Sequence, residues 1–185
     1  MNEETRQLIV RAQKGDSESF HKIVAIYDER IMILALQLTQ NEQDAEDVFQ
    51  ETFIKAYKNI KKFRFESEIF TWIYRIAINT AYNFKRKQSR MQILEPRQGD
   101  SRNHIQWLAS ENPGDDRSRG FKQAVRNSLQ ILPQQQRAVF ILKHLQNLKI
   151  RDIANILDIS EGTVKKYLFR AVEKLRLALK EYRYA

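Results

Sequence analysis

The stretch LKIRDIANILDISEGTVKKYLFRAVEKLRLAL, residues 148–179, predicts a helix, a tight turn and a second helix. Apolar residues recur at helical spacing on both sides of the turn: Ile150, Ile153, Ala154 and Leu157 before it, and Val164, Leu168, Ala171, Val172, Leu175 and Leu179 after it. Asp158, Ile159 and Ser160 form the predicted turn, and Ser160 is a typical helix N-cap.

The second of these helices keeps a polar face near its N-terminal half. Its members are Glu161, Thr163, Lys165, Lys166 and Arg170. In a helix-turn-helix motif this end of the second helix faces base edges in the major groove. The turn itself contains no glycine, so a plain helical hairpin is the alternative, and the charge favours DNA binding.

Composition limits the classes of protein to consider. The 185 residues are 42% hydrophobic and 30% charged, with 5 glycines and 3 prolines, which predicts a soluble, all-α protein. The net charge of +9 makes nucleic acid the leading partner and an anionic membrane surface the second. The chain has no cysteine, no signal peptide and no apolar run of the ~18–20 residues that span a bilayer, so we expect a cytoplasmic protein without disulfides.

Helical periodicity is weakest in MQILEPRQGDSRNHIQWLASENPGDDRSRG, residues 91–120, which holds two prolines and three glycines. We interpret this segment as a flexible linker between two small helical domains, residues 1–90 and 121–185.

The segment NEQDAEDVFQETF, residues 41–53, is acidic in a basic chain. Asn41 is the predicted N-cap, with Asp44 completing an approximate capping box. One stripe is predicted to be buried: Ala45, Val48, Phe49, Thr52, Phe53, Ala56 and Tyr57. Asp44, Asp47 and Glu51 share another face, flanked by Glu46 and Gln50. This face is either solvated or a docking surface for a basic protein, and the absence of basic residues favours docking.

The next segment mixes basic and aromatic residues. In KNIKKFRFES, residues 58–67, Phe63 and Phe65 either stack on unpaired bases or fill a small core. The helix predicted at residues 67–89 buries Phe70, Ile73, Tyr74, Ala77, Ala81 and Phe84, and Trp72 is also predicted to be buried. Its other side carries a stripe suited to phosphates and base edges: Arg75, Asn79, Asn83, Arg86 and Arg90.

Three motifs in this order resemble a bacterial RNA polymerase sigma factor of the extracytoplasmic-function (ECF) type, over nearly the whole chain. DAEDVFQETF (44–53) resembles the core-binding part of sigma region 2, and FTWIYRIAINTAYNFKRKQSR (70–90) resembles regions 2.3 and 2.4. LPQQQRAVFILKH (132–144) and the helix-turn-helix segment resemble region 4.

The resemblance implies the partners and the division of the surfaces. Asp44, Asp47, Gln50 and Glu51 would bind the β′ clamp helices of core RNA polymerase, through a contact that includes polymerase arginines; the β flap is a second polymerase contact. The −10 element of promoter DNA would be bound and opened by Phe63, Arg64, Phe65, Glu66, Ser67, Arg75, Asn79, Asn83 and Arg86. The −35 duplex would be read by Glu161, Thr163, Lys165, Lys166 and Arg170. An anti-sigma factor is a further expected partner.

Other classes explain the sequence less well. A stand-alone helix-turn-helix regulator would leave the acidic face and the aromatic–basic segment unexplained. The three scattered histidines, the lack of cysteine and the lack of a glycine-rich phosphate loop argue against an enzyme, a metal site, a cofactor or a small-molecule substrate. An RNA-binding protein fits the charge, but no known RNA-binding module fits the motifs.

Overall fold

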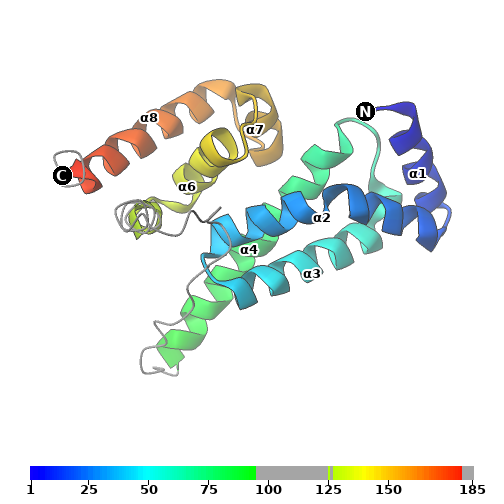
Figure 1. Cartoon of the computed structure of the whole chain (residues 1–185), viewed down its shortest axis with the longest axis horizontal. Coiled ribbons are helices and arrows are strands. Elements are labelled where there is room, and N and C mark those ends of the chain that lie inside the picture. Colours follow the sequence, from blue (N-terminus) through cyan, green and yellow to red (C-terminus); the bar gives the residue numbers. More distant parts are fainter. Residues whose placement is uncertain (95–124, 126, 181–185) are drawn as a thin grey trace, which may run out of the picture. The chain divides into compact units, whose positions relative to one another are not determined.

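The computed structural model describes residues 1–94, 125 and 127–180, which are helical with short turns and contain no strand (Figure 1). The chain divides into two compact units, one before and one after the undescribed segment, and each unit is considered separately. Most of the predicted linker lies outside the described residues. Its first four residues, 91–94, instead continue the preceding helix, so this helix is longer than predicted.

The N-terminal unit is a helical bundle in which α2, α3 and α4 pack against one another and α1 packs on α2 (Figure 1). The elements are α1 (Glu3–Gln13), α2 (Ser17–Thr39), α3 (Glu42–Asn59), the 3-10 turn η1 (Ile60–Lys62) and α4 (Ile69–Leu94). Its largest fully buried side chains come from α1, α2 and α4: Ile9, Ile23, Ile31, Leu34, Leu36, Ile69, Ile73 and Ile78. These largest fully buried side chains are all isoleucine or leucine.

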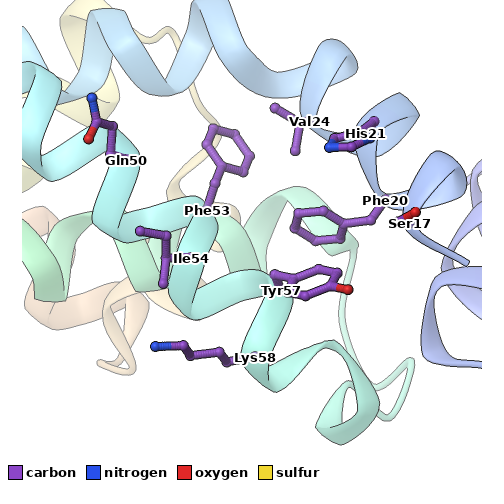
Figure 2. A pocket seen from close by; sticks show the side chains of 9 residues that line it. All are labelled: Ser17, Phe20, His21, Val24, Gln50, Phe53, Ile54, Tyr57 and Lys58. Carbon is purple, nitrogen blue, oxygen red and sulfur yellow. The ribbon is translucent and has the colours of Figure 1, made fainter. Parts of the chain in front are cut away.

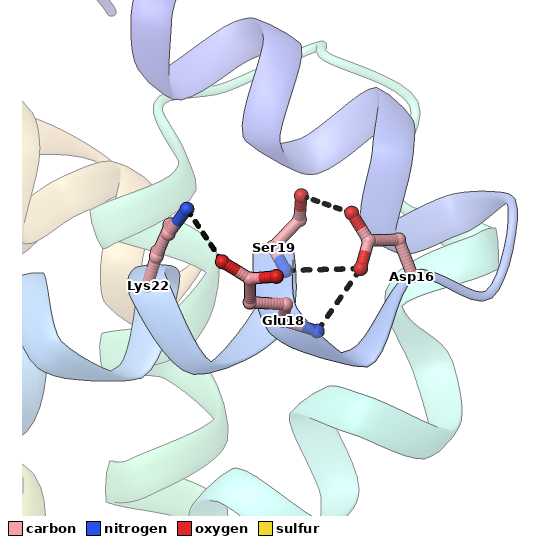
Figure 3. A network of polar contacts seen from close by, with 4 residues as sticks. All are labelled: Asp16, Glu18, Ser19 and Lys22. Atoms are coloured by element: carbon pink, nitrogen blue, oxygen red, sulfur yellow. Dashed lines mark hydrogen bonds and ion pairs between the residues drawn. The ribbon is translucent and has the colours of Figure 1, made fainter.

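Helix α2 begins at a strong N-cap. One carboxylate oxygen of Asp16 accepts from the backbone N–H of Glu18 at 3.0 Å and of Ser19 at 3.4 Å, and the other accepts from the Ser19 hydroxyl at 2.6 Å (Figure 3). These bonds, led by the Ser19 hydroxyl, lower the pKa of Asp16. The Glu18 carboxylate also forms an ion pair with the ammonium group of Lys22, one helical turn further on, at 2.9 Å. The cap sets where α2 starts after the turn at Gly15, whose φ of +99° suits glycine.

Helix α3 begins as predicted, with the Asn41 side chain accepting from the Asp44 backbone N–H at 2.8 Å. The Asn41 backbone N–H is directed at the Thr39 hydroxyl at 3.5 Å. It therefore does not form the second, reciprocal hydrogen bond of a capping box. The predicted stripe is buried at Ala45, Val48, Thr52, Phe53 and Ala56 and half-buried at Phe49. Tyr57 was wrongly placed in it: its side chain is 49% exposed, because it lies at the edge of the α2–α3 contact.

Helix α4 buries the predicted side through Ile73, Tyr74, Ala77 and Ala81, with Phe70 and Phe84 half-buried at its margins. Trp72 is only half-buried, with its ring 5.4 Å from that of Phe63.

The C-terminal unit contains α6 (Gln134–Phe140), the π-helical turn η2 (Ile141–Leu145), α7 (Ile150–Leu157) and α8 (Glu161–Ala178). Leu129, Leu132, Ala171 and Leu175 form a buried cluster with Phe140 against it. The Tyr167 hydroxyl donates to Gln135 at 2.8 Å and so ties α8 to α6.

The predicted helix-turn-helix is confirmed in α7 and α8. Asp158 ends α7 in the left-handed conformation, with φ 56°, and the Ile159 N–H donates to the Ala154 carbonyl at 3.1 Å. Aspartate tolerates this conformation better than most residues, which explains a turn without glycine. Ser160 then caps α8 by accepting from the Thr163 N–H at 3.1 Å.

Two details of the predicted core are wrong here. Val172 is 37% exposed, because the neighbouring helices cover only the side of α8 that carries Ala171 and Leu175. Ile156, which was not predicted, is buried, whereas Leu157 is half-buried beside the turn.

Candidate functional site

The exposed side of α3 carries an acidic surface. Asp47, Gln50 and Glu51 are exposed as predicted and follow one another at helical spacing. Glu51 also forms an ion pair with Lys55 at 3.2 Å, one helical turn further on. The three side chains therefore form a continuous surface, called here the acidic surface.

Asp44 is set apart from these residues. It is half-buried and accepts a long hydrogen bond from the Gln88 side chain of α4 at 3.4 Å. Burial raises the pKa of Asp44, opposed by the bond from Gln88. Asp44 thus lies where the acidic surface meets α4.

An apolar hollow of about 490 Å³ continues the acidic surface between α2 and α3 (Figure 2). Phe20 and Val24 line it from α2, and Phe53, Ile54 and Tyr57 line it from α3, with Gln50 at its margin. Ile54 and Tyr57 are 45% and 49% exposed. Neither exposure is predicted from the sequence, although the position of Ile54 outside the predicted buried stripe is a signal for it.

The predicted polar stripe of α4 is exposed at Arg75, Asn79, Asn83 and Arg86. The Arg86 guanidinium donates to the Asn83 amide oxygen at 3.1 Å, so these two side chains are oriented together. Asn79 and Asn83 also line a second hollow, of about 440 Å³, with Trp72 of α4 and Lys55, Asn59 and Lys62 from the end of α3 and η1. The stripe is therefore one wall of a basic, amide-rich depression.

The two phenylalanines of the aromatic–basic loop between η1 and α4 differ in burial. Phe63 is 5% exposed and packs edge-on against Phe65, with ring centroids 5.1 Å apart. We therefore correct its predicted role: Phe63 is a core residue, and a base cannot stack on it in this conformation. Phe65 is half-buried, and Arg64 and Glu66 beside it are exposed, with Ser67 half-buried.

Helix α1 holds this loop in place. The Gln13 side-chain amide donates to the carbonyls of Ile60 at 3.0 Å and Phe63 at 2.8 Å. Arg6 places its guanidinium carbon 5.1 Å from the centre of the Phe65 ring. Phe65 has φ 60°, a left-handed conformation that is unusual for a large side chain. Strained backbone of this kind persists where surrounding contacts enforce it, and it is often found at functional sites.

In the C-terminal unit, Glu161, Lys165, Lys166 and Arg170 are exposed on α8 as predicted. Thr163 is half-buried, and its hydroxyl lies 2.8 Å from that of Ser160 in the helix cap. Phe169, which sequence analysis did not single out, is 65% exposed between these basic residues. Its neighbours Lys165, Lys166 and Arg170 give this half of α8 a positive surface.

The described part of the chain contains no group of three His, Cys, Asp or Glu side chains arranged to hold a metal ion. None of its helices is both long enough and apolar enough to cross a membrane.

Family profiles match both units. A profile described as Sigma-70 region 2 matches residues 23–91, and one described as Sigma-70, region 4 matches residues 122–175. The RNA polymerase sigma-H factor of Pseudomonas aeruginosa is 34% identical over 185 residues, covering 96% of this chain and 94% of that protein. The ECF RNA polymerase sigma-E factor of Haemophilus influenzae is 35% identical over 176 residues, covering 91% of each.

Solved structures with the same fold include CnrH, in complex with the cytosolic domain of CnrY. It has a TM-score of 0.71 and 21% identity, and the match covers 97% of this chain and 99% of that one. The sigma factor RpoE of Bartonella quintana, in complex with the anti-sigma factor NepR, has a TM-score of 0.70 and 24% identity, with coverage of 88% and 98%.

Proposed function

The chain belongs to the ECF group of the sigma-70 family of RNA polymerase sigma factors, and on this premise we propose how its surfaces divide the work. It directs RNA polymerase to promoters for transcription initiation. We propose that residues 1–90 bind core polymerase and open the −10 element, that residues 121–185 read the −35 element, and that residues 91–120 link the two.

The polymerase contact is assigned to the acidic surface of α3. Asp47, Gln50 and Glu51 offer carboxylates and an amide to arginines of the β′ clamp helices. The adjoining apolar hollow, with Ile54 and Tyr57 exposed at its mouth, adds a place for an apolar side chain of the same partner. Asp44 contributes from the margin, and the β flap is the second polymerase contact.

The −10 contact is assigned to the loop before α4 and to the exposed stripe on that helix. Phe65 supplies the ring on which an unstacked base rests, and Arg64, Glu66 and Ser67 surround it. Asn79 and Asn83 present amides to base edges, whereas Arg75 and Arg86 present charge to phosphates. Phe63 packs edge-on against the Phe65 ring and does not itself contact DNA.

The −35 contact is assigned to the exposed half of α8. Lys165, Lys166 and Arg170 would bind phosphates and base edges in the major groove, with Glu161 and Thr163 at the helix start.

Regulation by an anti-sigma factor is proposed because a protein of the same fold, the sigma factor RpoE, is known in a complex with the anti-sigma factor NepR. We further propose that the chain acts in the cytoplasm, where polymerase and promoters are, and that it has no catalytic activity of its own.

The observation that carries the proposal is the order of sigma regions 2 and 4 along a chain whose acidic and basic surfaces lie on different helices. The test is in vitro transcription of genomic fragments from the source bacterium with purified core polymerase, with and without this protein. Discrete start sites should appear only when both proteins are present. Sequence-specific DNA binding without polymerase, and no new start sites, would favour a stand-alone helix-turn-helix regulator.

A further inference from the structure

Lys55 lies between the acidic surface of α3 and the DNA-facing stripe of α4. Its ammonium group is 3.2 Å from a carboxylate oxygen of Glu51 and donates to the Thr80 hydroxyl at 3.3 Å. Glu51 belongs to the proposed polymerase contact, and Thr80 follows Asn79, a proposed DNA contact. Lys55 therefore joins the acidic surface of α3 to the helix that carries the proposed DNA contacts, and it shares a hollow with two of them, Asn79 and Asn83.

The surroundings of Lys55 suit a phosphate group. It lines the hollow between α3 and α4, whose other polar members include Lys62, Asn59, Asn79 and Asn83. Among the described residues no carboxylate lines this hollow, and Glu51 reaches Lys55 from outside it. An anion entering the hollow would meet two ammonium groups and several amide donors.

Glu51 limits what Lys55 can offer to such an anion. An ammonium group has three donors, and in the free protein two of them are directed at Glu51 and Thr80. A polymerase arginine bound to Glu51 would neutralise that carboxylate and weaken its hold on Lys55. Because the Glu51–Lys55 ion pair is exposed, breaking it should change the affinity of Lys55 for an anion by roughly fivefold at most.

We propose that Lys55 is a DNA-phosphate contact that Glu51 restrains until polymerase binds. When an arginine engages Glu51, the Lys55 ammonium turns to a phosphate of the DNA strand held along α4. Since linkage is reciprocal, DNA bound to Lys55 in turn strengthens the contact of Glu51 with polymerase. This inference rests on the proposed function, because it assumes that α3 binds polymerase and α4 binds DNA.

The test imitates polymerase binding by removing the charge of Glu51. The full-length protein is titrated against a fluorescein-labelled, mixed-sequence single-stranded DNA oligonucleotide, and anisotropy is measured over a range of salt concentrations. Glu51→Gln should tighten binding about two- to fivefold and steepen the log–log salt dependence by up to ~0.7, the value for one phosphate contact on a single strand. In a Lys55→Gln background, Glu51→Gln should have no such effect.

Glu46→Gln is the matched control, because Glu46 is an exposed acid of the same helix outside every proposed contact. It changes net charge equally, so its effect should be small and the same in both backgrounds. Lys55→Arg keeps the cation and should keep the response to Glu51→Gln, which guards against a folding defect in Lys55→Gln.

Equal effects of Glu51→Gln and Glu46→Gln, or an effect of Glu51→Gln that survives Lys55→Gln, would overturn the inference. Loss of the response in Lys55→Arg would do the same. If these results come with normal polymerase-dependent transcription, only the role of Lys55 fails. An absence of such transcription in the wild-type protein would instead overturn the proposed function.

Discussion

Phe65 offers a way to separate DNA opening from protein stability. Its backbone has φ 60°, which glycine adopts without strain and phenylalanine does not. Phe65→Gly therefore removes the ring while keeping the loop conformation.

The expected change in stability follows from the contacts of the ring. Loss of the Arg6 guanidinium contact removes about 0.5–1 kcal/mol. Loss of the edge-on contact with Phe63 removes about 0.5–1.5 kcal/mol. Glycine adds about 0.5–1 kcal/mol of chain entropy to the unfolded state, and relief of the left-handed strain returns about 1–3 kcal/mol. The free energy of unfolding should thus fall by at most about 2.5 kcal/mol, whereas Phe63→Ala in the core should lower it by about 3–5 kcal/mol.

The effect on promoter opening should be larger and specific. If a base stacks on Phe65, losing the ring weakens the open complex by ~1–3 kcal/mol, roughly 5- to 150-fold. Permanganate footprinting measures opening as reactivity of promoter thymines with holoenzyme, on a promoter identified by transcription of genomic fragments. Gel-shift titration of closed duplex should show little change. A template with a pre-melted bubble should restore transcription by Phe65→Gly.

Two results would refute this reasoning. Normal thymine reactivity in Phe65→Gly would mean that no base stacks on the ring. A fall in unfolding free energy as large as that of Phe63→Ala would mean that Phe65 belongs to the core, and that its strained backbone is a packing feature.

Other surfaces give shorter tests. Lys166→Ala should weaken holoenzyme binding to closed duplex and lower the log–log salt slope by about 0.9, and a bubble template should not rescue it. Asp47→Lys combined with Glu51→Lys should weaken core polymerase binding at least tenfold, about 1.4 kcal/mol, with an unchanged melting temperature, as measured by pull-down and thermal melting. Burial raises the pKa of Asp44 above its unfolded value, so this group favours folding below the unfolded pKa and loses that contribution as pH rises through the folded pKa. Asp44→Asn should therefore gain stability relative to wild type in denaturant titrations as the pH rises from below the ordinary aspartate pKa to above the folded-state pKa. Limited proteolysis should cut within residues 91–120 and leave two helical fragments.

Periodicity predicted the helices and most of their buried faces, because a repeating apolar stripe is a local property of the sequence. It could not predict how far neighbouring helices extend. Tyr57, whose ring meets Phe20 of α2 edge-on, and Val172 occupy apolar positions that neighbouring helices cover only in part, and so they are exposed. Ile156 is buried although it lies just before the turn, in a helix that packs against both α8 and η2.

The loop at residues 63–67 shows a second limit. Phe63 and Phe65 are two residues apart in a segment without helical spacing, so no pattern distinguishes them. The structure does so through α1, which is distant from the loop in sequence: Gln13 donates to the Phe63 carbonyl, and Arg6 lies against the Phe65 ring. The Glu51–Lys55 pair was visible as an i, i+4 spacing, whereas the contact of Lys55 with Thr80 depends on the packing of α3 on α4.

The hydrogen bonds from Gln13 also determine when the loop takes shape during folding. They join residues 47 and 50 positions apart in the chain, so they form only after α1 has packed against the rest of the bundle. Helix α1 is a terminal element, and the free energy of local opening is lower for terminal elements than for a central core. Fraying of α1 should thus release the loop while α2, α3 and α4 stay folded. Backbone amides of the loop would then exchange with solvent deuterium together with those of α1, ahead of those in α3 and α4.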